Sequence, residues 1–217
     1  MQSILPIMLR KFLPLALLCG GCDTVLLADN FDSWPANYRQ GPIPGDPVGD
    51  EVFIPRLVGG GVPAAVAGPR LWFGGFERCE APTCDAVFTS APIPEDRRGD
   101  PMELMVGFDR LFANRSSRIR ITVRNDDGSP LFYIRIPGDT LATQIIHGGG
   151  VEESGRGFGV DEPDQIVIIP DDDGGSAIAF GRTFPLMHGV GNRIQVAVGY
   201  EGPGGGISRL YELQLRI

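Results

Sequence analysis

The sequence predicts an all-β protein, built as a two-sheet antiparallel sandwich of the jelly-roll type. Its 31 glycines and 19 prolines recur along the chain and divide it into short segments. Within these segments apolar and polar residues alternate, which is the pattern of a strand with one buried face. No segment of useful length carries apolar residues at helical spacing. Many short alternating strands separated by turn residues are typical of a sandwich or a barrel.

The expected strands follow one another along the chain, with turn residues between them. The first covers Val25–Phe31. The others are expected at 51–57, 70–76, 85–90, 102–109, 117–124, 131–136, 141–147, 165–169, 177–181, 192–200 and 208–217. Segments 36–50, 92–101 and 148–163 are rich in Pro, Gly or charged residues, so we expect loops there.

The clearest hairpin is expected over residues 117–136. Alternate residues of its two strands are apolar and are expected to face the core: Ile119, Ile121, Val123, Phe132, Ile134 and Ile136. The turn reads Asn-Asp-Asp-Gly-Ser-Pro, in which Gly128 supplies a positive φ and the Asx side chains bond the local backbone. A second hairpin is expected to join 165–169 to 177–181 through the Asp/Gly-rich segment 171–175.

The opposite face of the first hairpin is basic and aromatic. It carries Arg118, Arg120, Arg124, Tyr133 and Arg135. Because a guanidinium group pairs bidentately with carboxylates, one interpretation is a site for an anionic glycan, a carboxylate or an acidic partner. The other is a solvated face whose arginines pair with acidic residues of neighbouring strands. Asp109 and Arg110, at the end of strand 102–109, are expected to be such neighbours.

Composition limits the choice of partners. The formal net charge is −8. Such a surface repels nucleic acid and anionic lipid, so we expect no nucleic-acid partner. The residues that follow position 21 suit one domain, 22–217, which is long enough to bury a substantial core.

The first 22 residues have the pattern of an export signal. Arg10 and Lys11 precede the apolar run Phe12–Leu18, and Cys-Gly-Gly-Cys follows, ending at Cys22. This segment resembles the lipobox of bacterial lipoproteins. The resemblance implies a signal peptide at 1–21, acylation of Cys22, anchoring to a membrane through that lipid, and a place in the bacterial cell envelope facing the periplasm or the outside. Ordinary secretory cleavage and a retained membrane anchor are the alternatives, although the run is shorter than the about 20 residues of a spanning helix.

Cys79 and Cys84 form a second cysteine feature. Four residues separate them, and both follow the expected export signal. A close pair of cysteines in an exported protein predicts a disulfide that closes a small loop. A redox or metal-binding pair is the alternative, but redox motifs have two intervening residues rather than four.

The first and last strands carry a family resemblance. The segments Leu-Leu-Ala-Asp-Asn-Phe-Asp-Ser-Trp-Pro, from Leu26, and Ser-Arg-Leu-Tyr-Glu-Leu-Gln-Leu-Arg-Ile, at 208–217, resemble the paired terminal strands of concanavalin A-like lectin and glucanase sandwiches, including the laminin-G-like group. Residues 192–217 similarly look like the closing hairpin of that family. The resemblance implies a two-sheet jelly roll whose concave face binds sugars.

The residues for catalysis and metal binding are sparse. The Glu-x-Asp-x-x-Glu signature of glucanases does not occur, and the two histidines, His147 and His188, are expected in loops. We therefore expect no catalytic residue. The Asp clusters at 126–127 and 171–173 are expected to be turn residues, with structural calcium as the alternative; no other metal or cofactor is expected.

These observations favour a cell-envelope lipoprotein whose non-catalytic β-sandwich recognises a glycan, an anionic ligand or an envelope protein. A structural envelope lipoprotein that acts through protein contacts is one alternative. A hydrolase or lyase that acts on polysaccharides is the other.

Overall fold

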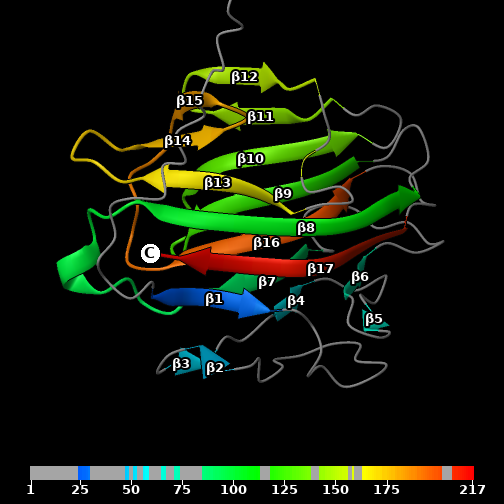
Figure 1. Ribbon diagram of the computed structural model, residues 1–217, viewed down its shortest axis with the longest axis horizontal. Helices are drawn as coiled ribbons and strands as arrows, with labels where there is room; N and C mark the ends of the chain where they lie inside the picture. The colour runs from blue at the N-terminus through cyan, green and yellow to red at the C-terminus, as the bar shows by residue number, and fades with distance from the viewer. Residues whose placement is uncertain are drawn as a thin grey trace, which may run out of the picture.

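The computed structural model describes residues 24–29, 47–48, 51–52, 56–58, 65–66, 71–73, 85–112, 118–137, 142–155, 158, 163–201 and 207–217. In this part of the chain the strands form two large antiparallel sheets that pack face to face (Figure 1). The predicted all-β sandwich is confirmed. Within the same residues, no helix is long and apolar enough to cross a bilayer.

Sheet A has the strand order β15–β14–β13–β8–β17–β6–β5. Two strands pair with the same side of β17. Strand β1 pairs with its C-terminal half, and β6 pairs with its N-terminal half. The bounds are β1 Val25–Asp29, β5 Ala65–Val66, β6 Leu71–Phe73, β8 Met102–Phe112, β13 Asp164–Ile169, β14 Ser176–Ala179, β15 Arg182–Pro185 and β17 Ile207–Arg216. The expected pairing of the first and last strands is therefore present.

Sheet B has the strand order β12–β11–β10–β9–β16–β7–β4 and lies behind sheet A in Figure 1. The bounds are β4 Arg56–Val58, β7 Asp85–Thr89, β9 Arg118–Asn125, β10 Pro130–Pro137, β11 Gln144–His147, β12 Gly150–Glu153 and β16 Ile194–Glu201. A separate pair, β2 (Pro47–Val48) and β3 (Glu51–Val52), belongs to neither sheet. A short 3₁₀ turn, η1, covers Glu95–Arg97.

The core lies between the two sheets and is filled by alternate side chains of both. Sheet A contributes Leu104, Val106, Phe108, Ile166, Ile168, Leu213 and Leu215, all fully buried. Sheet B contributes Ile121, Val123, Phe132, Ile134, Val196 and Val198, which are equally buried, and Ile119 and Ile136 are nearly so. Because the side-chain period of a strand is two, the residues between them lie on the outer faces. The predicted inward faces of hairpin 117–136 are confirmed.

Several expectations about the strands were wrong. Segment 36–50 was expected to be a loop but contains β2, and β5 was not expected. Segment 148–163 was expected to be a loop but contains β12, and β15 was not expected at all. Both are short edge strands that bury at most one side chain, so they lack an alternating apolar pattern. Strands β16 and β17 were expected as a hairpin but lie in different sheets, because alternation shows which side chains face the core and not which sheet a strand joins.

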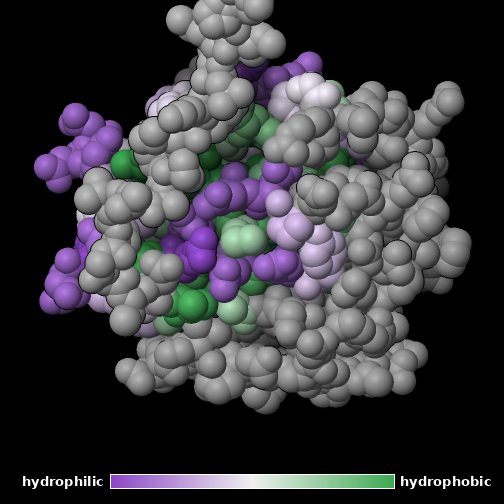
Figure 2. All heavy atoms as spheres, viewed as in Figure 1, coloured by the Kyte–Doolittle hydropathy of each residue, from purple (hydrophilic) through white to green (hydrophobic). Residues whose placement is uncertain are grey.

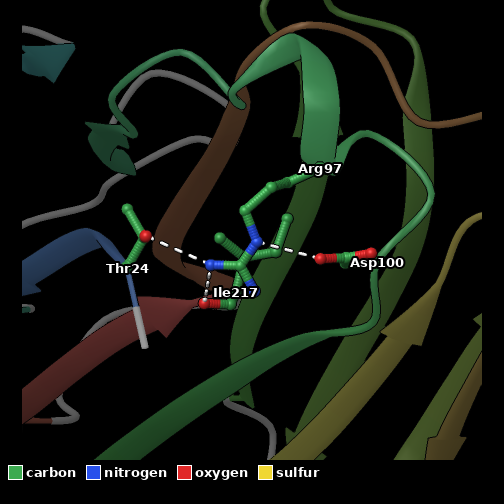
Figure 3. Close-up of polar contacts among 4 residues, drawn as sticks. All are labelled: Thr24, Arg97, Asp100 and Ile217. Carbon is green, nitrogen blue, oxygen red and sulfur yellow. Dashed lines mark hydrogen bonds and ion pairs between the residues drawn. The ribbon is translucent and has the colours of Figure 1, made fainter. Parts of the chain in front are cut away.

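Arg97 holds together the two ends of the described chain (Figure 3). Its Nη1 donates to Thr24 Oγ1 at 3.1 Å and to the carbonyl of Ile217 at 3.0 Å, while its Nε donates to Asp100 Oδ2 at 2.9 Å. Thr24 and Ile217 also exchange backbone hydrogen bonds of 2.8 and 2.9 Å. One guanidinium group thus fixes the start of β1 beside the end of β17.

Replacing Arg97 by Met should lower the free energy of unfolding by about 1–3 kcal/mol, since hydrogen bonds from a charged donor are lost. Urea denaturation followed by circular dichroism measures the change. The matched control is Arg98→Met, which removes an exposed arginine that donates to Asn192 Oδ1 at 3.2 Å and should cost less than about 0.5 kcal/mol. Equal losses in the two variants would contradict the role of Arg97.

The turn between β9 and β10 is held by Asp127. Its Oδ1 accepts from the Ser129 hydroxyl at 2.6 Å and from the Ser129 backbone N–H at 2.8 Å. These bonds, first that of the hydroxyl and then that of the backbone, hold the pKa of Asp127 below its ordinary value of 3.8. The bonds to the ionised carboxylate stabilise the turn above pH 3.8, and that contribution is lost as the pH falls through the lowered pKa.

Replacing Ser129 by Ala should raise the pKa of Asp127 toward 3.8, because the strongest donor to the ionised carboxylate is removed. A pH titration followed by the ¹³C NMR signal of the Asp127 carboxyl carbon measures it. Ser176→Ala, in sheet A, is the control and should leave that titration unchanged. An unaltered pKa in Ser129→Ala would show that the hydroxyl bond does not form.

Candidate functional site

The outer face of sheet B carries the predicted basic and aromatic residues. In β9 and β10 they alternate with the buried core residues, so they lie together on the side away from sheet A. All are half-buried: Arg118, Arg120, Arg124, Tyr133 and Arg135. We call this set the arginine face. The predicted orientation of its residues is confirmed, and whether they bind a ligand remains a prediction.

Strand register sets the arrangement within the arginine face. Arg120 lies directly opposite Arg135, and Tyr133 lies opposite Thr122 in the next row. Side chains in directly opposed positions start about 5 Å apart, so the two guanidinium groups share one small area. Arg118 begins the following row, opposite Pro137. Two or three positive charges are therefore concentrated beside one aromatic ring.

Arg124 is set apart from this concentration. It lies at the turn end of β9, and its Nε donates to Gln195 Oε1 on β16 at 2.9 Å. Arg118, Arg120 and Arg135 also have interaction partners within the chain. The Nε atoms of Arg120 and Arg135 are inaccessible to solvent. Asp109 and Arg110 are not neighbours, because β8 belongs to sheet A.

A polar row extends from the arginine face to the edge of sheet B. Arg135 lies opposite Gln144 of β11, and Gln144 lies opposite Glu153 of β12. The Gln144 amide donates to Glu153 Oε1 at 2.9 Å. The next row is apolar and runs from Tyr133 through Ile146 to Val151, which is 59% exposed. Polar and apolar rows therefore lie side by side across three strands.

The edge of the sandwich contains a cleft of about 780 Å³ between β11–β12 of sheet B and β13–β15 of sheet A. We call it the edge cleft. The two sheets meet beside it, where the Gly148 N–H donates to the carbonyl of Pro185 at 3.1 Å. A Cβ atom at Gly148 would overlap the carbonyl oxygen of Leu186, so only glycine permits this approach. The cleft is lined by Ile145, Glu152, Glu153, Ser154, Gly155, Asp164, Gln165, Ala179, Phe180, Gly181, Arg182 and Phe184.

His147 lies directly behind the lining of the edge cleft. The expectation of a loop histidine was wrong: it is the last residue of β11, only 7% exposed, and its ring packs on Phe184 with centroids 5.1 Å apart. Its Nδ1 accepts from the Gly149 N–H at 3.0 Å. Its Nε2 lies 3.9 Å from Glu152 Oε1, and the other oxygen of Glu152 lies 3.4 Å from Arg182 Nη1.

Sequence reasoning missed the edge cleft because it joins residues from two sheets. Part of the signal was present in Gln-Ile-Ile-His-Gly-Gly-Gly-Val-Glu-Glu, in which two glycines connect two short runs as in a tight hairpin. Reading the glycines as the start of a long loop hid β12. For the same reason, Glu152 and Glu153 were not predicted to be strand residues.

The remaining predicted residues have other roles or lie elsewhere. His188 is exposed, and its Nδ1 is 2.8 Å from the carbonyl oxygen of Pro130. Asp171 accepts from the backbone N–H groups of Asp173 and Gly175, as expected for a turn residue. Among the described residues, no group of three His, Cys, Asp or Glu is arranged to hold a metal ion. Cys22, Cys79 and Cys84 lie outside the described residues.

The outer face of sheet A is polar over its centre (Figure 2). On this face Arg216 of β17 donates from Nε to Glu103 Oε2 of β8 at 2.6 Å. The two residues are direct cross-strand partners. This pair is satisfied within the sheet and is not a candidate site.

No protein-family model matches this sequence, and no curated protein matches it. Solved structures with a similar fold include an apo Crh5 transglycosylase, at a TM-score of 0.53 and 11% identity over 90% of this chain and 87% of that one. A sialidase has a TM-score of 0.47 at 9% identity over 70% of this chain; the match spans only 16% of the sialidase. Lectin II from Ulex europaeus has a TM-score of 0.45 at 10% identity over 87% of this chain and 97% of the lectin. The likeness to the transglycosylase shows a shared β-sandwich fold.

Proposed function

We propose that this protein is a glycan-binding module that recognises an anionic saccharide on the arginine face. The observation that carries the proposal is the direct opposition of Arg120 and Arg135 beside Tyr133. Like charges at opposed positions of neighbouring strands destabilise a sheet. The opposed positions bring two guanidinium groups into one small area, where a single anionic group can accept hydrogen bonds from both.

The chemistry of the face suits a charged sugar. Guanidinium groups bind carboxylate or sulfate groups through paired, charge-assisted hydrogen bonds. Tyr133 and the apolar row beside it, Ile146 and Val151, supply surface for the C–H faces of sugar rings. The shared fold is consistent with this proposal, since one similar structure is named a transglycosylase, but the proposal depends on the residues of the arginine face.

The double variant Arg120→Gln with Arg135→Gln should weaken binding of a polyuronate oligosaccharide about 100-fold, because each lost charge-assisted interaction costs about a factor of ten. Isothermal titration calorimetry on the full chain measures it. Wild-type affinity should also fall as salt rises, since the contacts are between opposite charges.

The matched control is the double variant Arg98→Gln with Arg193→Gln. It removes the same amount of charge, from Arg98 directly after η1 and from Arg193 directly before β16. This variant should keep its affinity within twofold of wild type. If both double variants lose affinity equally, the effect is one of net charge alone. If the chain binds no anionic saccharide but binds a membrane protein, it acts through protein contacts.

We further propose that the chain is exported and carries lipid on Cys22, which places the domain on a membrane of the bacterial cell envelope. Arg97 holds Thr24, two residues beyond Cys22, against the folded domain. A lipid at Cys22 would therefore connect to the sandwich through a short tether. We also propose that Cys79 and Cys84 form a disulfide in that oxidising compartment.

Expression in a bacterial host should give a membrane-associated protein that has lost residues 1–21 and gained the mass of acyl chains. Replacing Cys22 by Ser should release it from the membrane, because the lipid supplies the anchor. Intact mass spectrometry and membrane fractionation measure the two effects, with Cys79→Ser as the control that keeps the anchor. A Cys22→Ser protein that stays on the membrane would contradict lipidation.

A further inference from the structure

We propose that the edge cleft is a second ligand site, which binds an uncharged, hydroxyl-rich group such as a sugar ring, with Glu152 as the central acceptor. The proposal does not depend on the arginine face, because none of the arginines of that face lines the cleft. It goes beyond the proposed recognition of an anionic saccharide.

The lining of the edge cleft combines an apolar floor with a polar rim. Ile145, Ala179 and Phe184 form the floor, and all three are at least 95% buried. Around them stand carboxylates, an amide and a guanidinium group: Glu152, Glu153, Asp164, Gln165 and Arg182. A concave, partly apolar surface with a few polar groups is the usual form of a small-ligand site. The floor suits the C–H face of a sugar ring, and the rim suits its hydroxyl groups.

A buried donor next to the lining of the cleft, Nε2 of His147, has no acceptor among the described residues. Because Nδ1 of His147 accepts from Gly149, the proton of a neutral ring is on Nε2. Among the described residues nothing accepts a hydrogen bond from this buried Nε2. The nearest carboxylate oxygen, Glu152 Oε1, is 3.9 Å away, too far for a hydrogen bond. Buried donors in this condition are rare and need a structural or functional explanation.

Two side chains approach the Glu152 carboxylate from two sides, but they do not occupy all of its hydrogen-bond acceptor positions. His147 approaches one carboxylate oxygen and Arg182 the other, at 3.9 and 3.4 Å. A carboxylate has about four acceptor positions, so Glu152 keeps most of them for a ligand. Contacts that are long in an unliganded site often shorten when the ligand binds. His147 is accordingly a positioning residue, which reaches the ligand only through Glu152.

The chemistry of the rim selects the class of ligand. Among the described residues of the lining, three carboxylates and one guanidinium group carry a net negative charge, which repels anionic sugars. A hydroxyl group donates to a carboxylate and at the same time accepts from a donor such as Arg182. An ammonium group cannot accept a hydrogen bond, so it leaves the donors of the rim without a partner.

The test measures binding of four neutral probes, namely the hexasaccharides of glucose, mannose, galactose and N-acetylglucosamine, to the full chain. Titration calorimetry gives affinities, and hydrogen exchange with mass spectrometry gives the location. At least one probe should slow exchange of residues 150–155 and 180–185. Glu152→Gln should weaken that probe tenfold or more, and the matched control Glu95→Gln, an exposed residue of η1, should not.

Two further variants separate positioning from packing. His147→Phe keeps a ring on Phe184 but removes the Nε2 donor, so it should fold and bind the probe more weakly. His147→Gln restores an N–H donor and should recover affinity even where its thermal stability is lower. The double variant Arg120→Gln with Arg135→Gln should keep the neutral probe bound, so failure of the proposed function and failure of this inference are distinguishable.

The inference is overturned if no neutral probe slows exchange in these segments, or if Glu152→Gln binds as tightly as wild type. Stronger protection of the cleft by a polyuronate hexasaccharide or by a diamine than by every neutral probe would also overturn it.

Discussion

The apolar layer shared by the two sheets is the constraint on which the remaining structure depends. Each central strand commits every second side chain to that layer, so the side chains between them must face outward. Ile121 and Ile134 are fully buried, and their neighbours Arg120 and Arg135 therefore meet on the outer face. A one-residue slip of either strand would move the arginines into the core, at a high cost in desolvation. Core packing thus keeps the arginine face in place.

The edge of the sandwich follows a different principle. At β12 and β15 the central alternation has ended, and the sheets are joined through a backbone contact at Gly148 and the packing of His147 on Phe184. Core residues such as Ile145 and Phe184 line a cleft there instead of being covered by a further strand. The edge cleft therefore has an apolar floor beside a polar rim, and the fold needs no distortion to bring them together.

The two candidate surfaces have opposite charge and are joined. The arginine face is basic, whereas the rim of the edge cleft is mostly acidic. Gln144 of β11 and Glu153 of β12 connect them. With adjacent strands about 4.8 Å apart, the row from Glu153 to Arg120 spans about 14 Å, which suits a short oligosaccharide more than a single ring.

The sequence alone determined the strand character of most segments, the two hairpins and the outward orientation of the arginines, because these depend on local alternation and turn chemistry. It did not determine that β16 and β17 lie in different sheets, since both strands bury the same kind of side chain. Only the tertiary structure decided that His147 lies behind Glu152 and beside Arg182. These residues come from separate strands in two sheets, and their approach depends on how the sheets pack rather than on any local pattern.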